Sequence, residues 1–388
     1  MRLSLLLLLL ALSVWPVVCR GQGLSTAGEY VERGAARFVK GDRQGALDDF
    51  NRAIELDSRQ SRAYFFRGVI RRGRGDGVGA FADFNKAVEI DPLYAAAYYF
   101  RGVVLQDWGN LRGALADYDK AIELDPKSAD AYNNRATVHT LMGNREGALA
   151  DFNKAVELDP RLDMAYNGRA HLHYAQGRMK EAVRDYDTAI ALNPSLAPAY
   201  AGRGNARFRG DDLDGALADY EKALQLDAVN VPGYLGRGYA KLFKGESDAA
   251  ISDFSAAMEL YPALDEPYYG RGLARGLKGE VEGAVADIHA GLEATAAAGA
   301  DPAGGVRGAD DAVGRMLADL TRFITRHPSR ARAYEVRGVV RLISGNELEA
   351  ERDFRRCKEL DPALKAEVEK AARAVKARGS RLGGIPPK

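Results

Sequence analysis

Residues 132–160 read YNNRATVHTLMGNREGALADFNKAVELDP. A Gly143-Asn144 pair separates two stretches in which small and aromatic residues recur at helical spacing, the second running from Ala148 to Leu158. Glycine can take the left-handed conformation that ends a helix, and Pro160 cannot continue one. This segment therefore predicts two short helices joined by a tight turn, each with one apolar stripe.

The same pattern recurs with a period of 34 residues, marked by Tyr30, Tyr64, Tyr98, Tyr132, Tyr166, Tyr200, Tyr234 and Tyr268, and once more by Tyr334. Each of these nine tyrosines is followed by Arg after three residues, Gly or Ala after four, Ala after 16 and Asp after 19. An aromatic residue follows after 20, except at Ile288. One hairpin cannot bury its apolar face alone, so the repetition predicts a stack of hairpins.

This pattern resembles the tetratricopeptide-repeat family, which has a 34-residue period, an aromatic start, an Ala-x3-Phe motif and a closing Pro. The resemblance covers residues 27–362. It implies an all-α fold, a right-handed superhelical solenoid of antiparallel helix pairs. It also implies that the first helix of each pair lines a concave side on which protein or peptide partners lie.

The repeats divide most of the chain into hairpins. Residues 27–298 hold eight tandem hairpins, and residues 331–362 hold a final one. Between them, residues 299–330 combine a Gly-rich break with a degenerate repeat that keeps one helix, at about residues 310–325. We interpret the break as tolerated decay into a surface loop, with a hinge or docking loop as the alternative.

The two ends of the chain differ from the repeats. Residues 1–21 combine a basic residue with 12 apolar residues, which predicts a secretory signal peptide cleaved after Cys19 or Gly21. An uncleaved anchor is one alternative, and lipidation of Cys19 is another that the preceding Val18 disfavours. We therefore expect an exported protein, in a periplasm or cell envelope or secreted, with a secretory lumen possible. Residues 363–378 predict a capping helix and residues 379–388 a disordered tail.

The composition and motifs argue against catalysis. Lys and Arg (55) balance Asp and Glu (54), which gives no global attraction to nucleic acid. The chain has no phosphate-binding glycine loop, nucleophile elbow or Cys/His cluster with metal spacing. His139 and His173 occupy equivalent places in adjacent units, but a metal there is disfavoured. Cys357, in a small-residue position, predicts a buried thiol. We expect no cofactor, small-molecule substrate or nucleic-acid partner, and membrane contact only through the N-terminus.

One departure from the family is systematic, because its usual Leu is Arg in all nine units. Each such Arg is followed 16 residues later by Asp, as in Arg135 and Asp151. We predict an Arg–Asp pair between the two helices of each unit, or with the neighbouring unit. Solvated charges are the alternative. Such pairs would fix helix register more than they add stability, because desolvation offsets much of the attraction.

If the resemblance holds, the partner surface comprises residues one, two, five and eight after each repeat tyrosine. Asn side chains there both donate and accept, so a row of them can hold an extended peptide backbone, and aromatics can anchor apolar side chains. The alternative is that these aromatics pack between helices and that the Asn residues are tolerated surface residues. Packing is favoured for Phe66 and Phe100. The exposed face also takes in Leu235 and Tyr269, and the candidate peptide-binding residues are Phe65, Tyr99, Asn133, Asn134, Thr137, Asn167, His171, Tyr174, Asn205 and Tyr239.

The function expected from these features is a non-catalytic adaptor that holds extended or helical segments of partner proteins. A general holdase for unfolded exported proteins is the main alternative, and an inert repeat rod is another. The Lys/Asn carboxylate clamp of some family members is not evident. Several glycines on the predicted face would leave it bare enough to seat a bulky helix or strand: Gly168, Gly202, Gly236 and Gly270.

Overall fold

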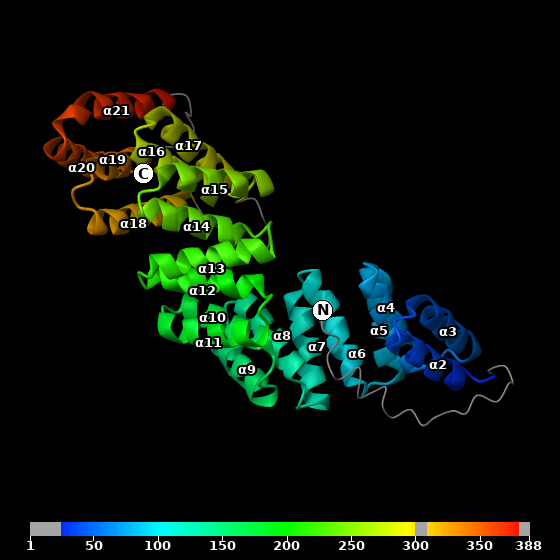
Figure 1. Cartoon of the computed structure of the whole chain (residues 1–388). Coiled ribbons are helices and arrows are strands. Elements are labelled where there is room, and N and C mark those ends of the chain that lie inside the picture. Colours follow the sequence, from blue (N-terminus) through cyan, green and yellow to red (C-terminus); the bar gives the residue numbers. More distant parts are fainter. Residues whose placement is uncertain (1–24, 299–308, 380–388) are drawn as a thin grey trace. The chain divides into compact units, whose positions relative to one another are not determined.

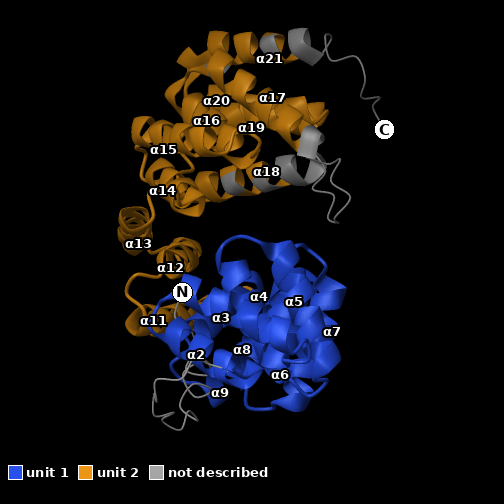
Figure 2. Ribbon diagram, turned by 90° about the vertical axis from the view of Figure 1, so that its right-hand side faces the viewer, with its two compact units in different colours: residues 1–176 blue, residues 177–388 orange. Residues whose placement is uncertain are grey.

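The computed structural model describes residues 25–298 and 309–379, and all regular structure in these ranges is helical. The chain forms two compact units, residues 1–176 and 177–388 (Figure 2). The division falls between the two helices of the repeat that begins at Tyr166, although the sequence of this repeat gives no sign of a boundary. The expected signal peptide, the Gly-rich run 299–308 and residues 380–388 lie outside the described residues.

Antiparallel helix pairs build unit 1, apart from α10, whose partner helix falls in unit 2 (Figure 1). Its helices are α2 (Ala27–Val39), α3 (Arg43–Leu56), α4 (Ser61–Gly73), α5 (Gly77–Ile90), α6 (Ala95–Asp107), α7 (Leu111–Leu124), α8 (Ala129–Leu141), α9 (Arg145–Leu158) and α10 (Asp163–Ala175). The even-numbered helices are the first helices of their repeats, and the odd-numbered ones are the second helices.

Unit 2 continues with α11 (Met179–Leu192), α12 (Ala197–Arg209), α13 (Leu213–Leu226), α14 (Val231–Phe243), α15 (Ser247–Leu260), α16 (Glu266–Lys278) and α17 (Val281–Ala298). After the undescribed run come α18 (Ala309–Arg326), α19 (Ala331–Ile343), α20 (Glu347–Leu360), the 3-10 helix η1 (Pro362–Leu364) and α21 (Lys365–Gly379). Helices α19 and α20 form the final hairpin. No helix in the described part of the chain is long and apolar enough to span a bilayer.

The hairpin turns follow from their residues. Gly143 lies in the left-handed region at φ 78°, and the Asn144 side chain then accepts a hydrogen bond from the Gly147 amide (3.0 Å), which caps α9. The equivalent turn after α12 has Asp211 in the left-handed position (φ 77°), where the other turns have glycine. An aspartate can adopt this conformation, at some cost in strain.

Aromatic residues of the second helices fill the space between helices, and glycine makes that space. Gly68 of α4 faces Phe84 of its own hairpin, and a methyl group in its place would come within 2.7 Å of the ring. Gly168 of α10 faces Phe152 of the preceding hairpin in the same way. Gly202, Gly236 and Gly270 each lie against the preceding aromatic, namely Tyr186, Tyr220 and Phe254. The expectation that the first-helix face is bare at these positions is therefore wrong, because an aromatic ring fills the space at each of the four glycines Gly168, Gly202, Gly236 and Gly270.

The predicted Arg–Asp pairs are confirmed in eight of the nine repeats, all except Arg169 and Asp185, which belong to different units. In each, the Arg of the first helix donates two hydrogen bonds to the Asp of the second. Arg67 Nε and Nη2, for example, lie 3.0 and 2.7 Å from the Asp83 carboxylate. The guanidinium also covers the repeat tyrosine, 5.2 Å from the Tyr64 ring centre. Because each of these Asp side chains is buried, solvated charges are excluded as the explanation.

A second cation lies seven residues after most repeat tyrosines, which the sequence reasoning missed. Arg71 Nη1 lies 2.9 Å from Asp83, and Lys241, Arg275 and Arg341 approach their own Asp in the same way. His139 takes this place 3.8 Å from Asp151. The signal was present in the sequence, since the position is basic in every repeat except that of Leu105. Six of these buried carboxylates are therefore held between two cations on successive turns of one helix.

Candidate peptide-binding surface

The first helices of unit 1 pack against one another from α2 through α10. Their residues one, five and eight after the repeat tyrosine fall on one helical face, because these positions are three or four residues apart. We call this face the first-helix surface of unit 1. Tyr99 on α6, Asn133 and Thr137 on α8, and Asn167 and His171 on α10 belong to it, and each is partly or fully exposed.

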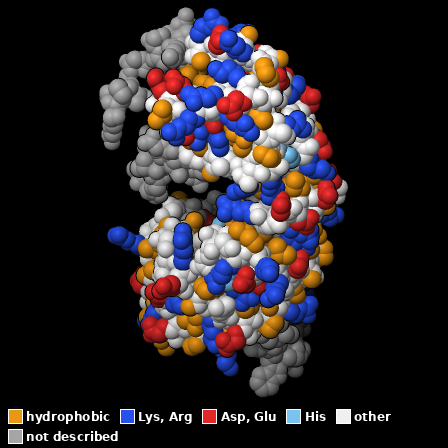
Figure 3. Space-filling view, turned by 90° about the vertical axis from the view of Figure 1, so that its left-hand side faces the viewer, with side chains coloured by type: hydrophobic (Ala, Val, Ile, Leu, Met, Phe, Trp, Pro, Cys, Tyr) orange, Lys and Arg blue, Asp and Glu red, His pale blue; other side chains and the backbone are white. Residues whose placement is uncertain are grey.

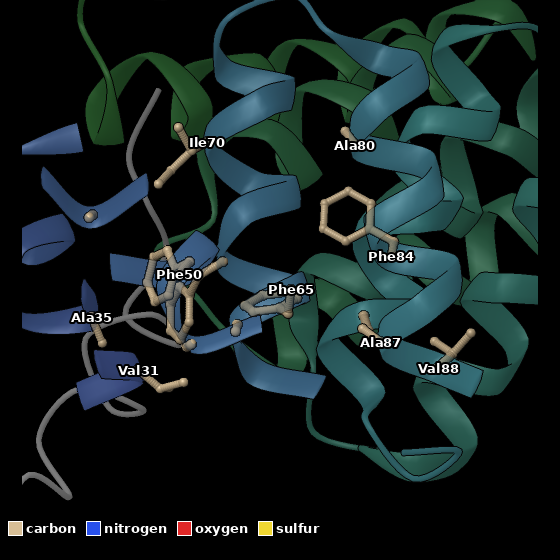
Figure 4. Packing of buried hydrophobic residues seen from close by; sticks show 14 of the residues in the cluster. Val31, Ala35, Phe50, Phe65, Ile70, Ala80, Phe84, Ala87 and Val88 are labelled. Carbon is tan, nitrogen blue, oxygen red and sulfur yellow. The ribbon is translucent and has the colours of Figure 1, made fainter. Parts of the chain in front are cut away.

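Phe65 does not contribute to this surface, and its expected role in binding is wrong. Its side chain is fully buried, with the ring centre 5.2 Å from Phe66, 6.1 Å from Phe84 and 5.5 Å from Phe100. Figure 4 shows Phe65 within the apolar layer that also holds Phe50 and Phe84. An aromatic side chain gains more from burial between repeats than from exposure to water.

The rings of Phe66 and Phe100 also pack between repeats, as favoured from the sequence. The Phe66 ring stacks on Phe50 of the preceding hairpin at 5.4 Å with an interplanar angle of 7°. Phe100 lies 5.9 Å from Phe84, again an aromatic of the preceding hairpin. These phenylalanines stand in the position that holds glycine in four later repeats, and in both cases an aromatic ring fills the space between hairpins.

A chain of hydrogen bonds joins three candidate residues across α6 and α8. Asn134 donates from Nδ2 to the Tyr99 hydroxyl over 3.0 Å, and Asn133 donates from Nδ2 to the side-chain oxygen Oδ1 of Asn134 over 3.1 Å. Burial raises the pKa of Tyr99 above its ordinary value, so the hydroxyl stays protonated. The Thr137 hydroxyl donates a hydrogen bond to the main-chain oxygen of Asn133 over 3.1 Å. The side-chain oxygen of Asn133 accepts no hydrogen bond from any described residue.

The neighbouring helix α10 carries the next part of the surface. Asn167, His171 and Tyr174 lie on one stripe, since they are separated by four and three residues. His171 is exposed and Tyr174 is half-buried. The Asn167 Oδ1 atom is buried and has no hydrogen-bond partner among the described residues. The structure therefore brings together seven of the ten candidates, on three successive first helices.

The remaining candidates, Asn205 and Tyr239, belong to unit 2 and have structural contacts there. Asn205 accepts a hydrogen bond from the Tyr220 hydroxyl over 2.8 Å. Tyr239 packs edge-on against Phe254, with ring centres 5.1 Å apart. Leu235 and Tyr269, also expected on the exposed face, are buried instead, in an apolar cluster that includes Met316 and Leu320 of α18. That expectation is wrong because α18, far along the sequence, lies over this part of the unit.

The charges of the molecule are mixed in sign. On the face shown in Figure 3, basic and acidic side chains are interspersed over the surface. Within the described ranges, no group of His, Cys, Asp and Glu side chains has a geometry that could hold a metal ion. Cys357 is buried, and burial raises the pKa of its thiol to about 12. A thiol with such a pKa remains protonated at neutral pH, so it is a poor nucleophile.

Helix pairs with a 34-residue repeat, inter-repeat aromatics and a polar first-helix surface define a helical-repeat interaction protein. Models of the tetratricopeptide repeat match residues 31–95, 107–143, 129–162 and 170–211. The chain belongs to the tetratricopeptide-repeat family and is a scaffold for protein–protein interaction. No curated protein sequence matches it.

Several solved structures resemble the chain in fold. A tetratricopeptide repeat protein from Parabacteroides merdae shares 24% identity over 61% of this chain and 93% of its own, with a TM-score of 0.49. PilF of Pseudomonas aeruginosa shares 22% identity over 53% and 94% of the two chains (TM-score 0.48). YrrB, described as a TPR protein with an unusual peptide-binding site, shares 22% identity over 47% and 95% (TM-score 0.40).

Proposed function

We propose that the chain is a non-catalytic adaptor that binds an extended peptide segment of a partner protein on the first-helix surface of unit 1. The observation that carries this proposal is the hydrogen-bonded series from Tyr99 through Asn134 to Asn133. It presents amide and hydroxyl groups in a half-buried setting, next to the exposed His171 on the adjacent helix. These are groups that can both donate to and accept from a peptide backbone.

The unpaired amide oxygens favour a polar ligand over an apolar one. Asn133 Oδ1 has no donor among the described residues, and Asn167 Oδ1 is buried without one. A buried acceptor without a partner costs roughly 1–3 kcal/mol, and turning the Asn167 amide toward a main-chain N–H of a bound segment would remove that cost. Tyr99 and Tyr174 flank these amides and offer aromatic surface to apolar side chains of the partner. The amides at the centre of the site then bind the backbone of the partner segment, and the tyrosines at its edges bind apolar side chains of that segment.

The binding test uses two variants of the full chain as baits in native extract. The site variant combines Asn133→Ala, Asn167→Ala and His171→Ala, which leaves the Asn134–Tyr99 bond in place. The control variant combines Glu146→Ala, Lys154→Ala and Glu157→Ala, three changes at exposed or half-exposed positions on the second helix α9. We expect one or a few proteins to be retained by the wild type and the control and lost from the site variant. Equal retention by all three chains refutes this site, and capture of many unfolded proteins by all three supports a holdase instead.

The proposal places this adaptor in an exported compartment. The support is the sequence of residues 1–21, a basic residue and an apolar run of signal-peptide length. Its partners are then proteins or peptides of that compartment, without nucleic acid or a small-molecule substrate. N-terminal sequencing of the protein recovered from its native source tests this: we expect a first residue just after Cys19 or Gly21. An intact Met1 would contradict cleavage.

A further inference from the structure

Helix α18 has an apolar face with the spacing of a helix that binds in a groove. Met316, Leu320, Phe323 and Ile324 fall at positions i, i+4, i+7 and i+8, and all four are buried. Gly314 and Ala318 lie on the opposite side and are exposed. The helix is therefore amphipathic, with one face fully covered.

The surface that covers this face includes residues of first helices, and α17 also packs against α18. Met316 and Leu320 share an apolar cluster with Leu235 and Leu242 of α14 and with Tyr269 and Leu273 of α16. Phe323 packs edge-on against Phe243 at the end of α14, with ring centres 5.4 Å apart. Figure 1 shows α18 beside the end of α14. These α14 and α16 positions correspond to those that form the first-helix surface in unit 1.

Polar contacts fix the C-terminal end of α18 on the same surface. Arg326 pairs with Asp211, the residue in the left-handed turn after α12, and its guanidinium lies 5.5 Å from the Phe243 ring centre. His327 Nε2 is 3.2 Å from the Phe243 main-chain oxygen. The ion pair remains partly open to water, because 67% of the Asp211 side chain is exposed. It therefore contributes more to the orientation of α18 than to the strength of its attachment.

Helix α18 also lacks what every complete repeat provides. By its sequence spacing it is the second helix of a degenerate repeat, and the described helix before it, α17, forms a hairpin with α16. The covered face of α18 lies against the first helices of two earlier repeats, and α18 also packs against α17 and against α19 of the repeat that follows. The chain thus holds one of its own amphipathic helices on a surface of the kind that carries the candidate peptide-binding residues in unit 1.

We propose that the first-helix surface of α14 and α16 is a binding site for an amphipathic helix, that α18 occupies it within the chain, and that a partner helix with the α18 pattern binds there in place of α18. The ligand is defined by its chemistry: apolar residues at i, i+4, i+7 and i+8, followed two residues later by a basic side chain that reaches Asp211. Attachment to the same chain gives α18 a high effective concentration, so the free site is available only when α18 is weakened or outcompeted. Unit 1 and unit 2 then accept different partners, one extended and one helical.

The probe is a fluorescent peptide with the sequence of residues 309–327, titrated into full-length chains and followed by anisotropy. In one chain Met316→Glu and Phe323→Glu disrupt the apolar face of α18, and in a milder one Arg326→Ala removes only the ion pair. A control chain carries Ala318→Glu on the exposed side of α18. We expect the disrupted chain to bind the peptide at least tenfold more tightly than the wild type, the Arg326→Ala chain to show a smaller gain, and the control chain to match the wild type.

Two further measurements establish where the peptide binds. A peptide with Phe323→Ala should bind the disrupted chain at least tenfold more weakly, and so should the normal peptide when the chain also carries Phe243→Ala. Hydrogen exchange over α14 to α17 reports whether the disrupted chain keeps those helices. If they remain protected and neither weakened chain binds the peptide better than the wild type, the proposal fails. If helices α14 to α17 are no longer protected in the disrupted chain, the proposal is tested by the Arg326→Ala chain alone. The unit 1 site variant carries none of these changes, so the two proposals fail independently.

Discussion

Arg203 and Asp219 link the two helices of one hairpin and the hairpin before it. The Arg203 guanidinium donates from Nε and Nη2 to the Asp219 carboxylate over 2.9 and 2.6 Å, and from Nη1 to Asp187 of the preceding second helix over 2.6 Å. Only 4% of the Asp219 side chain is exposed. Three helices therefore meet at one guanidinium, and the same arrangement recurs at Arg135 with Asp151 and Asp119.

Replacing Arg203 by Leu, the family's usual residue, should destabilise unit 2. The buried Asp219 loses its bidentate partner, and removing one partner of a buried pair costs about 3–5 kcal/mol. Arg207, 2.9 Å from the same carboxylate, remains and should bring the loss to the lower end of that range. Urea denaturation followed by circular dichroism measures the change. The double variant Arg203→Leu, Asp219→Ala should recover much of the loss, and a double variant less stable than the single would contradict the explanation.

Replacing Gly168 by Ala should destabilise unit 1, because the added methyl group would overlap the Phe152 ring of the preceding hairpin. Such overpacking costs about 1–3 kcal/mol. Gly73 of α4 provides a matched control, since a methyl group there meets nothing within 4 Å. Gly73→Ala should leave stability unchanged or raise it by up to about 1 kcal/mol, because alanine favours the helix. Thermal melts of both variants test this. Equal melting temperatures would show that the ring moves aside without cost.

Glu335 should make the stability of unit 2 depend on pH. It lies on α19 in a small cavity lined by Gly276, Ile288 and Val336, with 1% of its surface exposed. Burial raises its pKa from 4.5 to about 7, and the nearby Glu367 adds to the rise while Arg332, 3.5 Å away, opposes it. The folded state therefore holds the proton more tightly than the unfolded chain. The stability that protonated Glu335 contributes is fully present below about pH 4.5 and is lost as the pH rises through about 7.

The variant Glu335→Gln should remove this dependence. At pH 8 it should be more stable than the wild type, by an amount on the order of 2 kcal/mol, while at pH 5 the two should nearly coincide. Urea denaturation at pH 5, 6, 7 and 8 measures the difference. The exposed Glu351 of α20 serves as the control, and Glu351→Gln should follow the wild-type pH profile. Parallel profiles for the wild type and Glu335→Gln would show that Glu335 does not titrate in this range.

The first-helix surface of unit 1 was only partly predictable. Asn133, Asn167 and His171 lie on first helices at positions that helical spacing alone identifies. The burial of Phe65 was not predictable from that spacing, because a ring at the edge of a stripe turns toward whichever neighbour accommodates it. That neighbour, Phe100, lies one repeat further along the chain. Glu335 shows the same limit, since it is the equivalent residue of the final repeat and is also buried.

The sequence by itself determined the helices, their turns and the Arg–Asp pairs, because these depend on spacings within about 20 residues that every repeat copies. Only the tertiary structure decided which surface is free. Gly168 faces a ring of the preceding hairpin, and α18 covers Leu235 and Tyr269 from more than 40 residues away. Contacts of that kind depend on how the chain returns on itself and on which apolar faces remain to be buried. A local repeat pattern does not carry that information.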